Sequence, residues 1–187
     1  MEYVDPIKDV EQINLMKSIL RKSSLRDYVF FVLGINTGIN VGDLLQLSVA
    51  DVWDGQHAKQ FLRLRDCKTG KEKTFYLNDK VREALEEYIV HERLQQGDYL
   101  FKSRKDNLPI SRQQAYRIIK KAAIQAGIKG RIGTHSLRKT FGYHAYLKGV
   151  AISLLMAIFN HHSPSETLHY IGIDKKENIP IKIDVNL

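Results

Sequence analysis

The chain has 187 residues, of which 43% are hydrophobic, so it can bury the core of one domain and is not a disordered tail. Its net charge is +8, and its single cysteine, Cys67, excludes an internal disulfide. The longest apolar run, about residues 28–35, is too short to cross a bilayer, and the acidic N-terminus does not look like a signal peptide, so we expect a cytoplasmic protein without a membrane partner.

The spacing of apolar residues predicts a mainly α-helical chain with a small antiparallel β-ribbon. Helices are expected at residues 8–22, 24–36, 41–47, 79–96, 111–126, 134–148, 152–159 and 164–170. Between the third and fourth helices, QFLRLRD and KTFYLN alternate like strands, and KTGKE between them is typical of a hairpin turn. The final IPIKIDVNL is ambiguous and could be extended. Because no repeat or long linker divides the sequence, we expect one domain.

The positive charge is concentrated in residues 101–150, which hold twelve Lys or Arg against one acid, Asp106. This segment carries +11, and the rest of the chain carries −3. Clustered cations release counterions from a phosphate backbone, so the segment predicts a nucleic-acid partner. An anionic membrane fits less well, because the basic residues are spread over several predicted elements. The residues that we expect to contact DNA are Lys102, Arg104, Arg112, Arg117, Lys120, Lys121, Arg131 and Lys139.

The segment THSLRKTF places two phosphate-binding side chains on one helix face. His135 and Arg138 are three residues apart, so their side chains point the same way from the predicted helix. Arginine offers a planar pair of donors to a phosphate, and histidine can donate a hydrogen bond or move a proton. Taken alone, such a pair is usually only two surface residues.

The segment FNHHSPSETLHYIGI combines histidines with a tyrosine near a helix end. Ser163 fits an N-cap, so His161 precedes a helix whose second turn carries Tyr170. Without further context, a tyrosine here is most often a core or rim residue. Five of the seven histidines lie between residues 135 and 169, but their spacing fits no common zinc site, so we expect no metal and no cofactor.

Together these segments resemble the catalytic domain of tyrosine recombinases, the phage integrase family. HSLRKTF, His161 and Tyr170 carry the likeness, NTGINVGDLLQLSVADV looks like the family's first motif, and KTGK looks like its lysine hairpin. The resemblance spans about residues 24–172, and short integrase-like proteins of Gram-positive bacteria look most similar. It implies a single catalytic domain over residues 1–187, without a separate N-terminal core-binding domain and with residues 173–187 as a C-terminal tail.

The resemblance also implies a role for each matching residue in cutting and rejoining duplex DNA. Tyr170 would attack a phosphate and form a 3′-phosphotyrosyl link. Arg138 would hold the non-bridging oxygens, and His161 would add a hydrogen bond. His135 would assist proton transfer, and Lys68 would protonate the departing oxygen. The tail would join protomers on DNA, as family tails tend to do.

One position departs from the family pattern. The first motif normally carries an arginine that forms the second half of the phosphate clamp, and here this position is Asn40, although Asp43 still matches the family's acidic residue. Loss of one preorganised donor typically lowers a rate by about 10² to 10³. Two interpretations therefore stay open: an active site-specific recombinase, or a catalytically impaired DNA-binding or regulatory protein derived from one. A third, unrelated interpretation is a helical RNA-binding protein that uses the same charge. In that case the spacing of His135 and Tyr170 would be a coincidence.

The length of the chain is a second departure, because full recombinases grip DNA with an additional N-terminal domain. Only about 23 residues precede the first matching helix. The chain is therefore either a piece of a longer protein or a naturally minimal form.

Overall fold

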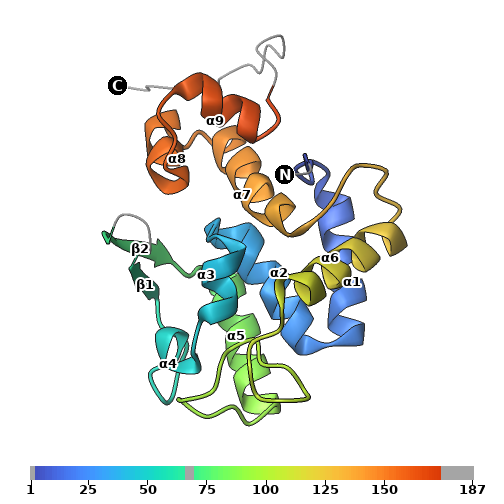
Figure 1. Cartoon of the computed structure of the whole chain (residues 1–187), viewed down its shortest axis with the longest axis vertical. Helices are drawn as coiled ribbons and strands as arrows, with labels where there is room; N and C mark the ends of the chain where they lie inside the picture. Colours follow the sequence, from blue (N-terminus) through green and yellow to red (C-terminus); the bar gives the residue numbers. More distant parts are fainter. Residues whose placement is uncertain (1–2, 66–69, 174–187) are drawn as a thin grey trace.

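The computed structural model describes residues 3–65 and 70–173. The described residues form a mainly helical structure with a two-stranded antiparallel sheet, which confirms the predicted fold class (Figure 1). The elements are α1 (Val10–Ser23), α2 (Leu25–Thr37), α3 (Val41–Gln46), α4 (Val49–Val52), β1 (Phe61–Arg65), β2 (Glu72–Tyr76), α5 (Asp79–His91), α6 (Arg112–Gln125), α7 (Thr134–Leu147), α8 (Ile152–Phe159) and α9 (Pro164–Tyr170). No helix in these ranges is long and apolar enough to span a membrane.

The helices begin where the sequence offers capping side chains. Ser24 accepts a hydrogen bond from the Asp27 amide at the start of α2, and Ser163 accepts one from Glu166 at the start of α9. Asn40 caps α3, as its position in the sequence predicts. These local signals explain why most predicted helix bounds lie within one or two residues of the observed ones.

Two elements differ from the sequence prediction. The fourth predicted helix ends at His91 instead of residue 96, because Arg93 adopts a left-handed conformation (φ 53°) and turns the chain away. The short helix α4 was not predicted, since four residues are too few to show a helical period. A capping box between Ser48 and Asp51 starts it.

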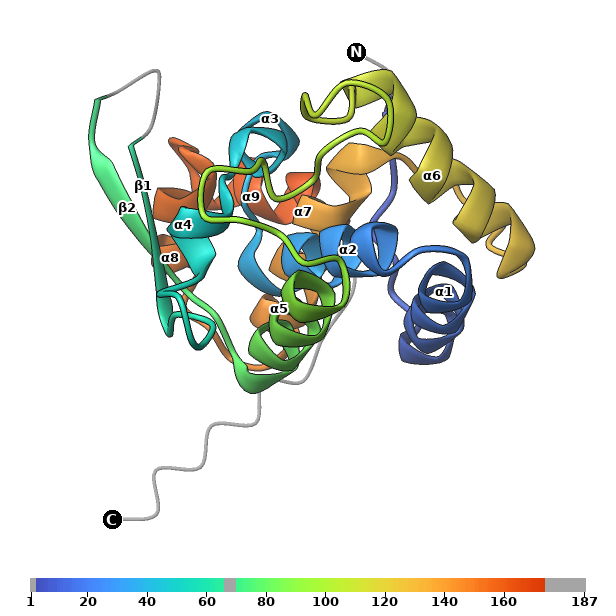
Figure 2. The ribbon, with the colours of Figure 1, turned by 90° about the horizontal axis from the view of Figure 1, so that it is seen from below.

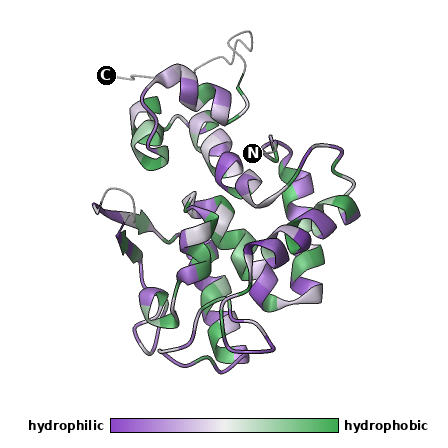
Figure 3. Ribbon diagram, viewed as in Figure 1, coloured by the Kyte–Doolittle hydropathy of each residue, from purple (hydrophilic) through white to green (hydrophobic). Residues whose placement is uncertain are grey.

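Helix α2 forms the centre of the main core. Its side chains, including the fully buried Phe30 and Phe31, pack between α1, α5 and α7 (Figure 2). A second, smaller core joins α7, α8 and α9 through Leu155, Phe159 and Ile171. Hydrophobic residues accordingly line α2 and α8, whereas much of α6 is hydrophilic (Figure 3). The C-terminal helices thus rest on the main body largely through α7.

The β-hairpin projects beside these helices (Figure 2). Its strands pair in register from Phe61 with Tyr76 to Arg65 with Glu72. Leu62 is fully buried, so one side of the ribbon is anchored to the core. The turn residues 66–69, including the predicted catalytic Lys68, and most of the C-terminal tail lie outside the described residues.

Candidate active site

Arg138 is held at the junction of α2, α7 and α8. Its guanidinium donates one hydrogen bond to the carbonyl of Gly38 and another, of 2.9 Å, to the carbonyl of Ile158. The ring of Phe159 lies beneath it, with 4.8 Å from Cζ to the ring centroid. Contacts from two directions fix the plane of the guanidinium, so the arginine is positioned before any substrate arrives.

Tyr170, the last residue of α9, lies directly beside this arginine. It is half-buried, and the positive charge of Arg138 acts on its hydroxyl. Its ring centroid lies 5.2 Å from that of Phe159 and 4.9 Å from that of His161. Burial raises the pKa of Tyr170, and the positive charge of Arg138 opposes that rise. The hydroxyl therefore keeps its proton near neutral pH, next to a fixed cation.

His161 follows α8, which ends at Asn160 in a left-handed conformation. Its Nδ1 lies 3.0 Å from the hydroxyl Oγ1 of Thr167, one turn before Tyr170. Burial lowers the pKa of His161, Glu166 opposes this, and Arg138 lowers it further. The imidazole is consequently neutral at physiological pH, with one ring nitrogen oriented by the threonine.

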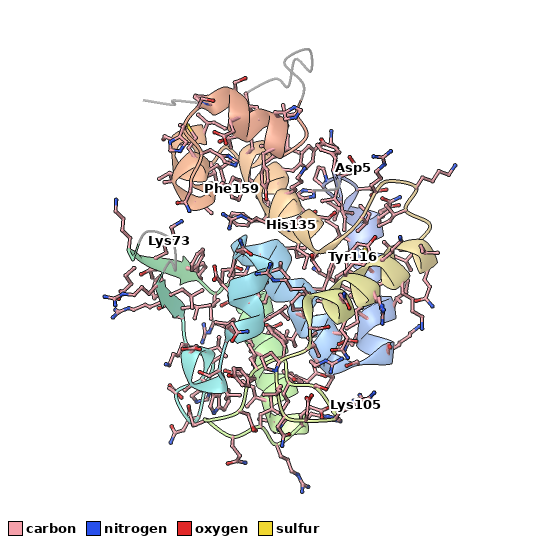
Figure 4. The ribbon with its side chains drawn as sticks, viewed as in Figure 1. Asp5, Lys73, Lys105, Tyr116, His135 and Phe159 are labelled. Atoms are coloured by element: carbon pink, nitrogen blue, oxygen red, sulfur yellow. The ribbon has the colours of Figure 1, made fainter. Side chains whose placement is uncertain are left out.

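His135 occupies the first turn of α7, one turn before Arg138. It is half-buried, and burial lowers its pKa, helped by the positive charges of Arg112, Arg138 and Lys139 in that order. A neutral imidazole has an unprotonated ring nitrogen that can accept a proton, and the neighbouring cations favour the later release of that proton. Figure 4 shows His135 where the start of α7 approaches the end of α8, which carries Phe159. Four of the predicted catalytic residues, Tyr170, Arg138, His161 and His135, thus come together.

The hairpin contributes Lys73, a residue that the sequence analysis did not select. From β2, its ammonium donates to Oδ1 of Asn160 at 2.8 Å and to the carbonyl of Ile158 at 3.4 Å. Arg138 donates to the same carbonyl, so the hairpin is tied directly to the site (Figure 4). The alternation of β2 in the sequence could have indicated that Lys73 points inward, because Lys73 shares the half-buried face of the ribbon with Phe75.

Asn40, at the position of the missing arginine, is exposed at the start of α3. Its Oδ1 accepts a hydrogen bond of 2.9 Å from the amide of Gly42. The side chain is therefore used as a helix cap, which requires an oxygen acceptor that an arginine could not supply. Asn40 follows Gly38 by two residues, and the carbonyl of Gly38 accepts a hydrogen bond from Arg138. Asn40 therefore lies on the same side of the molecule as this arginine.

Most of the predicted DNA-binding residues are exposed, but two of them lie away from the site. Arg104 belongs to the loop that carries Lys105, and Figure 4 shows Lys105 far from His135. Lys102, on the same loop, is half-buried and pairs with Asp98 at 3.0 Å. The exposed remainder lies on α6 and the segment after it: Arg112, Arg117, Lys120, Lys121 and Arg131.

Lys139 has a different environment from the one that a DNA-contacting lysine requires. Its side chain is only 6% exposed, and its ammonium donates to the carbonyl of Val4 at 2.8 Å. The ammonium also lies 4.1 Å from the ring centroid of Tyr3 and 5.1 Å from that of Tyr170. In the structure Lys139 therefore joins the N-terminal segment to the tyrosine. The basic residues around Lys139 in the sequence do not indicate that this lysine is buried.

Among the described residues, no group of three or more His, Cys, Asp or Glu side chains could hold a metal ion. The site brings together a tyrosine hydroxyl, a fixed guanidinium and two neutral imidazoles. Such a set suits an anionic centre that is attacked by an oxygen nucleophile.

Comparison with known proteins gives a consistent result. The profile of the phage integrase family matches residues 7–177. The chain is 41% identical over 175 residues to the probable integrase/recombinase YoeC of Bacillus subtilis, covering 94% of this chain and 93% of that protein. It is 28% identical to the tyrosine recombinase XerA of Pyrococcus furiosus over 89% of this chain, but spans only 57% of that relative.

Solved structures show the same fold. The crystal structure of XerA recombinase matches with a TM-score of 0.75 at 22% identity, over 93% of this chain and 61% of that one. A lambda integrase dimer bound to a COC′ core site matches with a TM-score of 0.69 at 18% identity, over 99% of this chain and 65% of that one. At this level of identity the likeness concerns the fold alone.

Proposed function

Because this chain belongs to the phage integrase family, we propose that it binds duplex DNA at specific sites and cuts and rejoins the strands through Tyr170. The observation that carries the proposal is the position of Tyr170, whose ring packs on Phe159 and His161 beside a guanidinium that the carbonyls of Gly38 and Ile158 already hold in place. Related folds have been captured on DNA, among them the XerH recombinase bound to its difH substrate. Their DNA complexes support duplex DNA as the substrate class here.

The proposed reaction exchanges one phosphoester bond for another. The Tyr170 oxygen attacks phosphorus, the bond from phosphorus to the 5′ oxygen breaks, and a 3′-phosphotyrosyl link and a free 5′-hydroxyl result. The tyrosine proton passes to the neutral imidazole of His135, and the 5′ oxygen takes up a proton as it leaves. Because the phosphodiester of the DNA is exchanged for a phosphodiester to tyrosine, the bond energy is retained in the covalent intermediate. Religation therefore needs no external energy source.

The negative charge that develops on the non-bridging oxygens needs donors that are in place beforehand. Arg138 supplies two N–H groups in a plane, and we assign His161 the tautomer in which Nδ1 accepts from the Thr167 hydroxyl and Nε2 supplies one N–H. We assign protonation of the 5′ oxygen to Lys68 of the hairpin turn. The contact of Lys73 with Asn160 supports this assignment, since it draws the hairpin toward the site.

A second candidate function is DNA binding without efficient cleavage, as in a regulator derived from a recombinase. Asn40 favours it, because an amide carries no charge and its oxygen is already engaged with Gly42. In this alternative the exposed basic residues of α6 would still attract DNA, while the phosphate clamp would lack one arginine.

The two functions differ in whether a covalent adduct forms. A pool of duplexes with a randomised segment and a nick would be incubated with the protein, and DNA that remains bound after denaturation would be recovered and sequenced. The nick lets the short 5′-hydroxyl fragment diffuse away, which traps the intermediate. We expect the wild-type protein to enrich a discrete sequence and Tyr170→Phe to recover nothing. Binding by the wild type without any adduct would instead support the regulatory function.

We further propose that the described residues act as the catalytic domain of the protein and that the tail, residues 173–187, joins protomers on DNA. The chain spans about half the length of several of its curated relatives, although it covers 93% of YoeC. Sedimentation with and without the recovered duplex tests the second part: deletion of the tail should weaken assembly on DNA but not binding of a single protomer.

A further inference from the structure

A second arginine reaches the start of α3, where Asn40 stands in place of the family's arginine. Arg112 is the first residue of α6, and its exposed side chain extends toward the start of α3. A Cβ atom built on Gly42 would lie only 2.6 Å from its Nη2 and 3.5 Å from its Cζ. The same point lies 3.5 Å from Oδ1 of Asn40. The guanidinium therefore stands over Gly42, immediately beside the Asn40 amide.

Gly42 is what permits this approach. Any larger residue would place a methyl group inside the contact distance of Nη2, and the end of the arginine side chain would have to move. Helix interiors otherwise disfavour glycine by about 1 kcal/mol relative to alanine. The backbone of Gly42 lies within α3, so the close approach of Arg112 is a reason for glycine here that helix propensity does not provide.

Arg112 also faces the catalytic side of the molecule. Of the charged groups that lower the pKa of His135, Arg112 has the largest effect, ahead of Arg138. Both guanidinium charges therefore act on this imidazole. Arg138 comes from α7 and Arg112 from α6, so the two cations approach His135 from different elements.

We propose that Arg112 supplies the second guanidinium of the phosphate clamp, in place of the arginine that Asn40 replaces. The inference rests on the proposed function and deepens it, because it makes Arg112 a catalytic residue that contacts a non-bridging oxygen of the scissile phosphate. Asn40 and Gly42 have a joint role in it: Asn40 starts α3 with a short side chain, and Gly42 leaves the space that the guanidinium occupies.

The ordinary alternative is that Arg112 only contacts the DNA backbone, like other basic residues of α6. The alternatives differ in the step that is affected. A backbone contact contributes to affinity, so its loss is overcome by saturating protein. A clamp residue stabilises the transition state, so its loss persists at saturation. Only a clamp residue should be replaceable by an arginine at position 40.

The test measures single-turnover formation of the covalent adduct at saturating protein, using the nicked duplex recovered from the randomised pool. We expect Arg112→Gln to lower the rate by about 10² to 10³ and Gly42→Ala to lower it as well, without reduced thermal stability. Arg93→Gln, which neutralises an exposed arginine after α5, should leave the rate unchanged. The double variant with Asn40→Arg and Arg112→Gln should cleave at least about tenfold faster than Arg112→Gln alone.

The inference is overturned if Arg112→Gln cleaves at the wild-type rate under saturation, or if Asn40→Arg gives no recovery in its background. It is also overturned if wild-type protein forms no adduct whereas Asn40→Arg alone does, because Arg112 then fails to replace the missing group while the site itself is sound. If neither protein forms an adduct with any duplex in the pool, the proposed recombinase function fails, and the clamp role of Arg112 fails with it.

Discussion

The guanidinium of Arg138 donates a hydrogen bond to the main-chain oxygen of Gly38, 100 residues earlier in the chain. Gly38 ends α2 in a left-handed conformation (φ 65°), and a Cβ there would overlap the ring of Phe141 on α7. The glycine therefore allows α2 to end close against α7, which brings its carbonyl to the arginine. The position of the central cation of the site depends on how two distant helices pack.

Gly38→Ala should destabilise the fold and displace Arg138. The left-handed conformation costs an alanine about 1 kcal/mol, and the overlap with Phe141 adds about 1–3 kcal/mol. We expect urea denaturation to show a loss of about 2–4 kcal/mol in the free energy of unfolding. The matched control is Gly127→Ala, which has the same backbone conformation (φ 72°) but open space around it. Equal losses in the two variants would contradict the packing argument.

Thr167→Val should slow adduct formation with little change in folding. The valine keeps the shape of the buried side chain but removes the hydroxyl that orients His161 at 3.0 Å. A hydrogen bond of this kind contributes about 0.5–1.5 kcal/mol, so we expect the saturated cleavage rate to fall by about 2- to 13-fold. Thr167→Ser retains the hydroxyl and should cleave nearly as fast as the wild type. If the serine variant is as slow as the valine variant, Thr167 acts through packing alone.

The stability of the protein should decline on mild acidification. Folding lowers the pKa values of His135 and His161 from the ordinary 6.5, mainly through burial. Below pH 6.5 the unfolded chain therefore binds more protons than the folded one, so stability is fully present above this pH and is lost as the pH falls through the folded-state pKa values. Urea titrations at about pH 7.5 and about pH 5.5 measure the difference. His135→Gln should show a smaller decline, and an identical decline would remove His135 from this linkage.

Neutralising Lys120 and Lys121 should weaken the salt dependence of DNA binding. Both lysines are exposed on α6, the helix that carries most of the accessible basic residues near the site. Each phosphate contact contributes about 0.9 to the slope of log affinity against log salt, so the double change to glutamine should flatten it by up to about 1.8. Because this term is independent of sequence, fluorescence anisotropy with any duplex suffices. An unchanged slope would place both lysines outside the interface.

The local features of this protein follow from its sequence alone. Apolar spacing and capping residues such as Ser24, Asn40 and Ser163 define most of the helices, because capping and helical periodicity act over one or two turns. The alternation of the hairpin strands is equally local. The spacing of His135 and Arg138 within one helix fixes their common face, and the order of motifs along the chain is enough to indicate the family.

Tertiary packing determined which side chains reach the site and which do not. Lys139 lies next to Arg138 in sequence, yet burial against Val4 and Tyr3 turns it inward, whereas Lys73 crosses from the hairpin to Asn160. Arg112 reaches Asn40 only because α6 and α3, some 70 residues apart, pack side by side over Gly42. Such contacts arise from the mutual fit of separate helices, and no pattern within a single segment encodes them.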